Sequence, residues 1–101
     1  MGVGAIVEEL EAEWKTNGFF DRIRSGDYDA ARGQAVLATL RAISIGDDEM
    51  APKRLVSLLW YLPSFLGWQA ERIAEKGGDR VAYERFVTEV HNTLEQVLGV
   101  P

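Results

Sequence analysis

The segment from Leu55 to Trp68 constrains the fold most, because ten of its fourteen residues are aliphatic or aromatic. A helix that crosses a membrane needs about 20 such residues in a row, and this segment is shorter and has charged residues on both sides. The sequence therefore predicts a buried helical segment at the centre of a core. Pro63 removes one backbone hydrogen bond and disfavours helical geometry at Leu62, so we expect a helix break near residue 62.

Apolar residues before this segment recur at steps of three and four, which is the spacing of an amphipathic helix. Between Val3 and Lys15 the apolar stripe is opposed by glutamates, and we expect Asn17 and Gly18 to end that helix. The apolar segment from Phe19 to Arg24 is then predicted to form one or two further helical turns.

Two aspartates are placed to cap further helices at their N-terminal ends. Asp27 is predicted to cap a helix that continues through Ile43 and Ile45 and ends at Gly46. Asp79 is predicted to cap the last helix of the chain, which Gly99 ends.

Proline and glycine residues set the remaining boundaries. Pro52 fits the first turn of the central helix, because its missing amide proton is not needed there. After the break at Pro63, one helix is expected to continue to Lys76 and to end at the pair Gly77 and Gly78. Gly33 costs roughly 1 kcal/mol inside a helix, and the small residues around it favour a close contact with another helix at this point.

No two segments of alternating polarity are joined by a hairpin turn, so the sequence predicts no strand. We therefore expect an all-α fold in a single domain over residues 1–101. Its predicted architecture is an antiparallel bundle of four main helices, or of five when the break at Pro63 is counted.

The charge balance and the absence of cysteine exclude several kinds of site. The chain has 16 acidic and 11 basic residues, a formal charge of −5, and no basic run longer than Lys53–Arg54, so we expect no nucleic-acid ligand. Without cysteine there is no disulfide and no thiolate, which favours a reducing compartment. The stretch from Met1 to Leu10 has no positive charge before its apolar run and does not resemble a secretory signal, so a cytoplasmic location is expected.

No catalytic or metal-binding motif is present. The single histidine, His91, lies four residues before Glu95 and is predicted to be solvated or in a local pair. The acidic run from Asp47 to Glu49 lacks the alternating oxygen ligands of a calcium loop, and no serine stands in a nucleophile elbow. We therefore expect a protein that is not an enzyme and that holds neither metal nor cofactor.

Clustered acidic residues are the first candidate for a binding surface. Nine of the sixteen carboxylates fall into three groups, which are Glu8, Glu9, Glu11 and Glu13, then Asp27 and Asp29, and then Asp47, Asp48 and Glu49. A face of one sign accelerates association with a partner of opposite charge, although a charge run can also be simply a solvated surface. The residues predicted to attract a basic protein partner are Glu8, Glu11, Asp27, Asp29, Asp47, Asp48 and Glu49.

Aromatic density is the second candidate, because ten aromatic residues are more than a small bundle can hide. Tryptophan and tyrosine left at the rim of a core are the residue types that anchor protein interfaces. Trp14, Phe19, Tyr61 and Trp68 are the candidates, since each lies near a helix end, near a break or opposite its neighbours. Trp14 and Trp68 are predicted to make buried contact with a partner.

Several of these elements together resemble a known class of protein. They are the stretch from Trp14 to Phe20, the turn Gly26-Asp27-Tyr28-Asp29 and the element Trp60-Tyr61-Leu62-Pro63. In size, acidity and helical character the whole chain resembles the small acidic immunity proteins that bacteria make beside polymorphic and contact-dependent inhibition toxins. The resemblance implies an inhibitor that covers a cognate, often basic, toxin domain.

Two alternatives to this inhibitor function remain open. One is a homo-oligomeric structural protein, possible as a homodimer, whose exposed apolar residues around Trp60 to Trp68 pair with a second copy. The other is a small-ligand binder with a pocket opened by the kink at Pro63. That pocket would be lined by Tyr61, Trp68, Arg72 and Tyr83.

Overall fold

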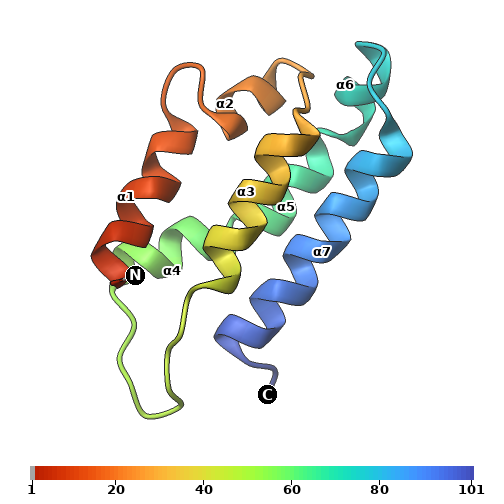
Figure 1. Cartoon of the computed structure of the whole chain (residues 1–101). Coiled ribbons are helices and arrows are strands. Elements are labelled where there is room, and N and C mark those ends of the chain that lie inside the picture. The colour runs from red at the N-terminus through yellow and green to blue at the C-terminus, as the bar shows by residue number, and fades with distance from the viewer. Residues whose placement is uncertain (1) are drawn as a thin grey trace.

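The computed structural model describes residues 2–101, which fold into helices with no strand (Figure 1). The described residues form the helical segments α1 (Val3–Trp14), α2 (Phe19–Arg24), α3 (Ala30–Arg41), α4 (Lys53–Trp60), α5 (Leu62–Trp68), α6 (Ala70–Glu75) and α7 (Arg80–Leu98). The predicted all-α fold is confirmed. None of the helices over residues 2–101 combines the length and the apolar character that crossing a bilayer requires.

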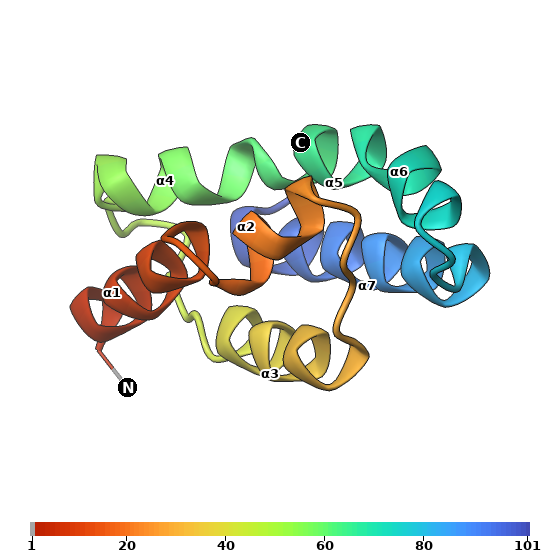
Figure 2. The same ribbon diagram turned by 90° about the horizontal axis from the view of Figure 1, so that it is seen from above.

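Successive main elements alternate in direction (Figure 1). Helix α1 runs upward, α3 downward, the row of α4, α5 and α6 upward again, and α7 downward. From above, α4, α5 and α6 form one row along the back of the molecule, with α1 and α3 on the opposite side (Figure 2). Helix α7 packs against α3, α5 and α6, while α1 packs against α2, α3 and α4.

Several boundaries lie where the sequence predicts them. Gly77 has a left-handed φ of 83° after α6, as expected. Helix α1 ends earlier than predicted, at Trp14, with Lys15 as an extended C-cap, and Asn17 with its φ of 65° lies in the turn that follows. The predicted break near residue 62 is present, because α4 ends at Trp60 and α5 begins at Leu62. The Asp79 carboxylate accepts a hydrogen bond from the Ala82 amide at 3.0 Å and caps α7 as expected.

The predicted boundaries of α3 are wrong at both ends. The N-cap is Asp29, whose carboxylate accepts a hydrogen bond from the Arg32 amide at 3.1 Å, and not Asp27. The helix ends at Arg41 and does not reach Gly46. Ile43 and Ile45 instead turn inward while Ser44 is exposed, which is the alternation of an extended chain and suits β-branched residues.

Two boundaries around the central segment also differ from prediction. Pro52 precedes α4 as its N-cap and does not lie in its first turn, because its ψ of 135° is extended. The helix expected to run on to Lys76 is divided at Gln69, whose amide donates to the Leu66 carbonyl at 3.2 Å in a tighter turn. This second bend brings Ala70 and Ile73 into the core beside α7.

The core closes around a contact between α3 and α7. A Cβ atom added to Gly33 would lie 3.2 Å from Phe86 and 3.3 Å from Tyr28, so the predicted close helix contact is confirmed. Tyr83 is fully buried, and its hydroxyl donates to the Leu66 carbonyl at 2.6 Å, which joins α7 to α5. Burial raises the pKa of the Tyr83 phenol, because the charged phenolate would lose its solvation.

Candidate functional site

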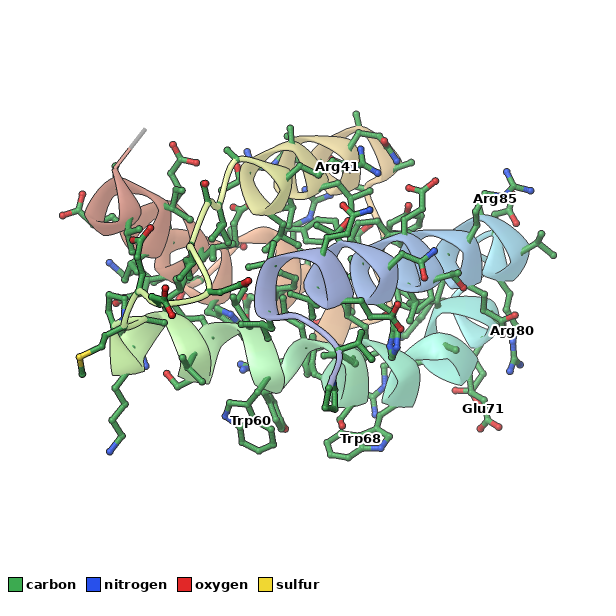
Figure 3. The ribbon with its side chains drawn as sticks, turned by 90° about the horizontal axis from the view of Figure 1, so that it is seen from below. Arg41, Trp60, Trp68, Glu71, Arg80 and Arg85 are labelled. Atoms are coloured by element: carbon green, nitrogen blue, oxygen red, sulfur yellow. The ribbon has the colours of Figure 1, made fainter. Side chains whose placement is uncertain are left out.

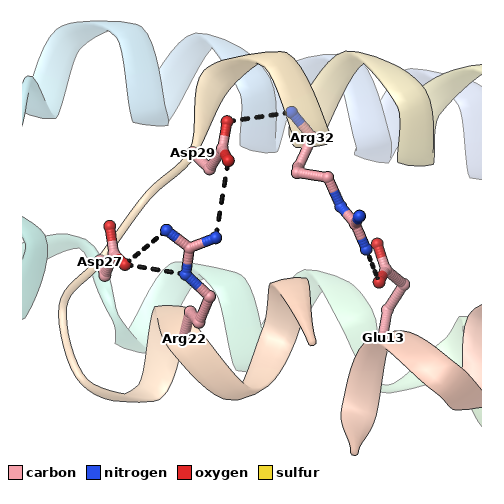
Figure 4. Close-up of polar contacts among 5 residues, drawn as sticks. All are labelled: Glu13, Arg22, Asp27, Asp29 and Arg32. Atoms are coloured by element: carbon pink, nitrogen blue, oxygen red, sulfur yellow. Dashed lines mark hydrogen bonds and ion pairs between the residues drawn. The ribbon is translucent and has the colours of Figure 1, made fainter. Parts of the chain in front are cut away.

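The candidate acidic residues Asp27 and Asp29 are held by an arginine (Figure 4). Arg22 contacts Asp27 at 2.8 Å and Asp29 at 3.5 Å, and Asp29 also caps α3. The hydrogen bond to the Asp27 carboxylate is the main cause that raises the pKa of the Arg22 guanidinium. Asp29 thus fixes the start of α3, and the single positive charge of Arg22 offsets one of the two carboxylate charges.

The glutamates of α1 point to different sides of that helix. Glu13 pairs with Arg32, and Glu9 accepts a hydrogen bond from the Thr39 hydroxyl at 3.1 Å, so both face α3 (Figure 4 shows the Glu13 pair). The candidate residue Glu11 instead faces α4, where it lies 3.4 Å from Arg54. The fourth glutamate, Glu8, is exposed.

The remaining acidic candidates, Asp47, Asp48 and Glu49, lie in the loop between α3 and α4. This loop lies at the end of the molecule where α1 begins, and the turn that holds Asp27 and Asp29 lies at the other end (Figure 1). The Glu49 side chain accepts a hydrogen bond from the Gly46 amide at 3.0 Å. The structure therefore does not bring the predicted acidic residues onto one face.

Part of the acidic set nevertheless carries uncompensated charge. Within residues 2–101, the candidate carboxylates without a salt bridge are those of Glu8, Asp47, Asp48 and Glu49. All four residues are exposed.

Three aromatic side chains, Trp60, Tyr61 and Trp68, form an exposed surface, which we call the aromatic face. Trp60 is 63% exposed, Trp68 66% and Tyr61 36%. The Tyr61 ring lies between the two indoles, with centroids 5.7 Å from Trp60 and 5.9 Å from Trp68. Figure 3 shows Trp60 and Trp68 projecting away from the other helices. The prediction that Trp68 lies at the surface is confirmed.

The other aromatic candidates lie deeper. Phe19 is 1% exposed and packs edge-on against Phe20 and Phe86, so its prediction as a rim residue is wrong. Phe19 is the first residue of α2, next to a turn, and this position in the sequence suggested a rim residue although the side chain lies in the core. Trp14 is half-buried, and its ring centroid lies 4.7 Å from those of Phe20 and Phe65.

Trp60 was not among the single residues selected from the sequence, although a signal for it exists. The core stripe of this segment is Leu55, Leu58, Leu59 and Leu62. Trp60 lies out of phase with that stripe, so helical periodicity alone places its side chain toward solvent.

A groove of about 370 Å³ adjoins the aromatic face. Its lining residues are Trp14, Arg24, Arg54, Ser57, Leu58, Trp60 and Tyr61. The Arg24 guanidinium carbon lies 5.3 Å from the centroid of the Trp14 ring, a cation–π distance. The Trp14 indole nitrogen is buried and has no hydrogen-bond acceptor within residues 2–101.

The residues predicted to line a pocket at the Pro63 kink do not come together around one. Tyr83 is fully buried and bonded to the Leu66 carbonyl, so it lines no open space. Arg72 is turned toward α2, where it donates to the Arg24 carbonyl at 2.9 Å. The kink instead displays Trp60, Tyr61 and Trp68 outward.

The single histidine of the chain lies on α7. His91 pairs with Glu95 at 3.1 Å on the exposed side of α7, which confirms the predicted local pair. Among residues 2–101 no group of three or more histidine, aspartate or glutamate side chains is placed to hold a metal ion.

Comparisons with protein-family models, with curated proteins and with solved structures give no match for this chain.

Proposed function

We propose that this chain is a non-enzymatic binding module and that it docks another protein through the aromatic face. The observation that carries the proposal is the exposure of two tryptophans with a tyrosine packed between them. Contiguous exposed apolar surface marks an interaction site in a small soluble domain, and tryptophan and tyrosine dominate the binding energy of protein interfaces.

The aromatic face also suits docking because its side chains stand on helices that are packed into the core. Trp60 and Tyr61 stand at the end of α4, and Trp68 at the end of α5, on helices whose inner sides hold Leu59, Leu62 and Leu66 in the core. Aromatic side chains with few rotatable bonds lose little conformational entropy on binding when their backbone is already fixed.

A tagged protein tests this proposal by pull-down from the lysate of the native cell, followed by mass spectrometry. We expect a stoichiometric protein partner to be captured by the wild type and lost in the double variant W60S/W68S. The matched control is V81S/L98S, which removes two exposed apolar side chains at the two ends of α7. Equal capture by both double variants would refute the aromatic face as the docking surface.

A second copy of the chain is the alternative occupant of the aromatic face, since a two-fold dimer uses the same patch on both subunits. Light scattering distinguishes the two at high protein concentration. If the wild type has twice the monomer mass and W60S/W68S has the monomer mass, the occupant of the aromatic face is a second copy of the chain and not another protein.

The narrower function is an immunity-type inhibitor of a basic toxin domain in a bacterial cytoplasm. It is supported by the uncompensated carboxylates of Glu8, Asp47 and Asp48, which attract a basic protein over long range. We expect D47N/D48N to lower the association rate at low salt, with the dissociation rate unchanged. An association rate that is independent of salt and of this substitution would exclude electrostatic attraction of the partner by these carboxylates.

A further inference from the structure

Two grooves among residues 2–101 differ in how many of their polar side chains already have a partner within the protein. The groove between α1 and α3, of about 300 Å³, is lined by Glu9, Glu13, Arg32 and Thr39. These four side chains already pair with one another across it. The groove beside the aromatic face contains cationic side chains and an indole donor with incomplete partners, so it is the one with capacity to bind.

Two arginines from different helices line this second groove. Arg24 comes from α2 and Arg54 from α4. Their carboxylate partners are loose, because Arg24 lies 3.9 Å from Asp21 and Arg54 lies 3.4 Å from Glu11, against 2.8 Å for the pair of Arg22 with Asp27. Both arginine side chains are also more than half exposed. A guanidinium has five N–H donors, so most of these donors stay free for an incoming acceptor.

The walls of the groove have a different chemistry from its cations. Trp60 and Tyr61 supply exposed aromatic rings, while Trp14 forms a half-buried wall beneath Arg24. A ligand that fits must therefore combine a negative charge with an adjacent apolar or aromatic group.

We propose that the groove recognises an acidic side chain of the docking partner, held between Arg24 and Arg54 next to an aromatic or aliphatic side chain against Trp60 and Tyr61. The inference rests on the proposed function and specifies the partner's docking segment. It is argued from charge complementarity, since arginine binds carboxylates in a fixed, charge-assisted geometry. The long-range field of the acidic loop and this local anchor are separate properties, and a partner that is basic overall can present one carboxylate.

The protein's own carboxylates, Glu11 and Asp21, compete with the partner's carboxylate for the two arginines. Substitutions are therefore expected to change the affinity in opposite directions. Glu11 and Asp21 offset part of the positive charge of Arg54 and Arg24, and they can occupy donors that an external carboxylate would otherwise use. Removing Glu11 should therefore tighten binding, whereas removing either arginine should weaken it.

Nuclear magnetic resonance on the full ¹⁵N-labelled chain measures the affinity of the groove for two matched probes, N-acetyl-tryptophan and its uncharged amide. The three indole N–H signals, from Trp14, Trp60 and Trp68, report on the groove and the aromatic face separately. We expect the carboxylate probe to shift the Trp14 and Trp60 signals, and the amide to bind about tenfold more weakly, the factor for one charge-assisted hydrogen bond. Equal affinity for the two probes, or no shift at either residue, would overturn the proposal.

Variants assign the effect to the groove. R24Q and R54Q should each weaken the carboxylate probe about tenfold, E11Q should strengthen it, and R41Q should leave it unchanged. Figure 3 shows that Arg41 lies away from Trp60 and Trp68, and the spectrum of each variant reports its folding. A decrease on E11Q, or an equal loss on R41Q, would overturn the assignment.

The pull-down separates this inference from the proposed function. Partner capture that is lost in W60S/W68S but retained in R24Q/R54Q would overturn the carboxylate anchor and leave the aromatic face standing. Capture retained in both would refute the aromatic face, whatever the probe experiment shows.

Discussion

Two glycines within helices, Gly33 in α3 and Gly67 in α5, provide a sharp test of the packing that holds the aromatic face in place. We predict that Gly67→Ala stabilises the protein and that Gly33→Ala destabilises it. In both helices alanine restricts the unfolded chain and favours helix, a gain of about 0.5–1 kcal/mol where the new methyl group fits. Nothing lies within 4 Å of a Cβ at Gly67, so that gain should be realised.

At Gly33 the same methyl group meets two rings. It would lie 3.2 Å and 3.3 Å from two atoms of Phe86 and 3.3 Å from Tyr28. The Phe86 ring has no room to withdraw, because Phe86 is 1% exposed and packs edge-on against Phe19, while the half-buried Tyr28 ring packs against Tyr83. Overpacking of this kind costs about 1–3 kcal/mol, which exceeds the helix gain. The two variants should therefore differ by about 2 kcal/mol in unfolding free energy.

Thermal and urea unfolding followed by circular dichroism measure this difference. For a chain of this size about 2 kcal/mol corresponds to a separation of roughly 10 °C in Tm, with Gly67→Ala above the wild type and Gly33→Ala below it. Equal urea m-values would show that both variants unfold from the same compact state. A Gly33→Ala protein as stable as Gly67→Ala would refute the close packing of α3 on α7.

Two further predictions concern the scaffold. Tyr83→Phe should cost about 1 kcal/mol at neutral pH, because the Leu66 carbonyl loses its buried donor. That cost should shrink above pH 10. At such a pH the unfolded wild type releases the Tyr83 proton, whereas the raised pKa keeps the proton bound in the folded state, so the wild type loses stability that Tyr83→Phe does not lose. Urea titrations at pH 7 and pH 10.5 measure both effects. Asp29→Ala should cost about 1 kcal/mol through the lost cap of α3, whereas Asp27→Ala should leave the urea midpoint nearly unchanged; an equal loss in both would contradict Asp29 as the cap.

The helices were predictable because their signals are local. Apolar periodicity, the proline at 63 and the cap at Asp79 each act within a few residues, and each acts as expected. The end of α3 was not predictable in this way. Ile43 lies three residues beyond Leu40, a position that serves equally for a continuing helix stripe and for an extended chain folded back on the core.

The acidic residues show why a candidate site is harder to predict than a helix. Glu13 finds its arginine 19 residues away, and Glu11 pairs with Arg54 of α4, so their compensation depends on tertiary packing that no local pattern contains. Clustering in the sequence predicted one negative face, whereas the fold turns Glu9 and Glu13 toward α3 and Glu11 toward α4.

The net charge of the chain is therefore a poor guide to its local recognition. A charge of −5 fixes the far field, but an arriving side chain responds mainly to the charges within about a Debye length, roughly 8 Å at physiological salt. The charged residues that line the groove beside the aromatic face are Arg24 and Arg54. Asp21 and Glu11, at 3.9 and 3.4 Å from them, lie within the same range and offset part of this positive charge. An acidic protein can thus attract a basic partner from a distance and still anchor it by a carboxylate, because different residues decide the two steps. The acidic loop before α4 contributes to the long-range attraction, whereas Arg24 of α2 and Arg54 of α4 contribute the local contact.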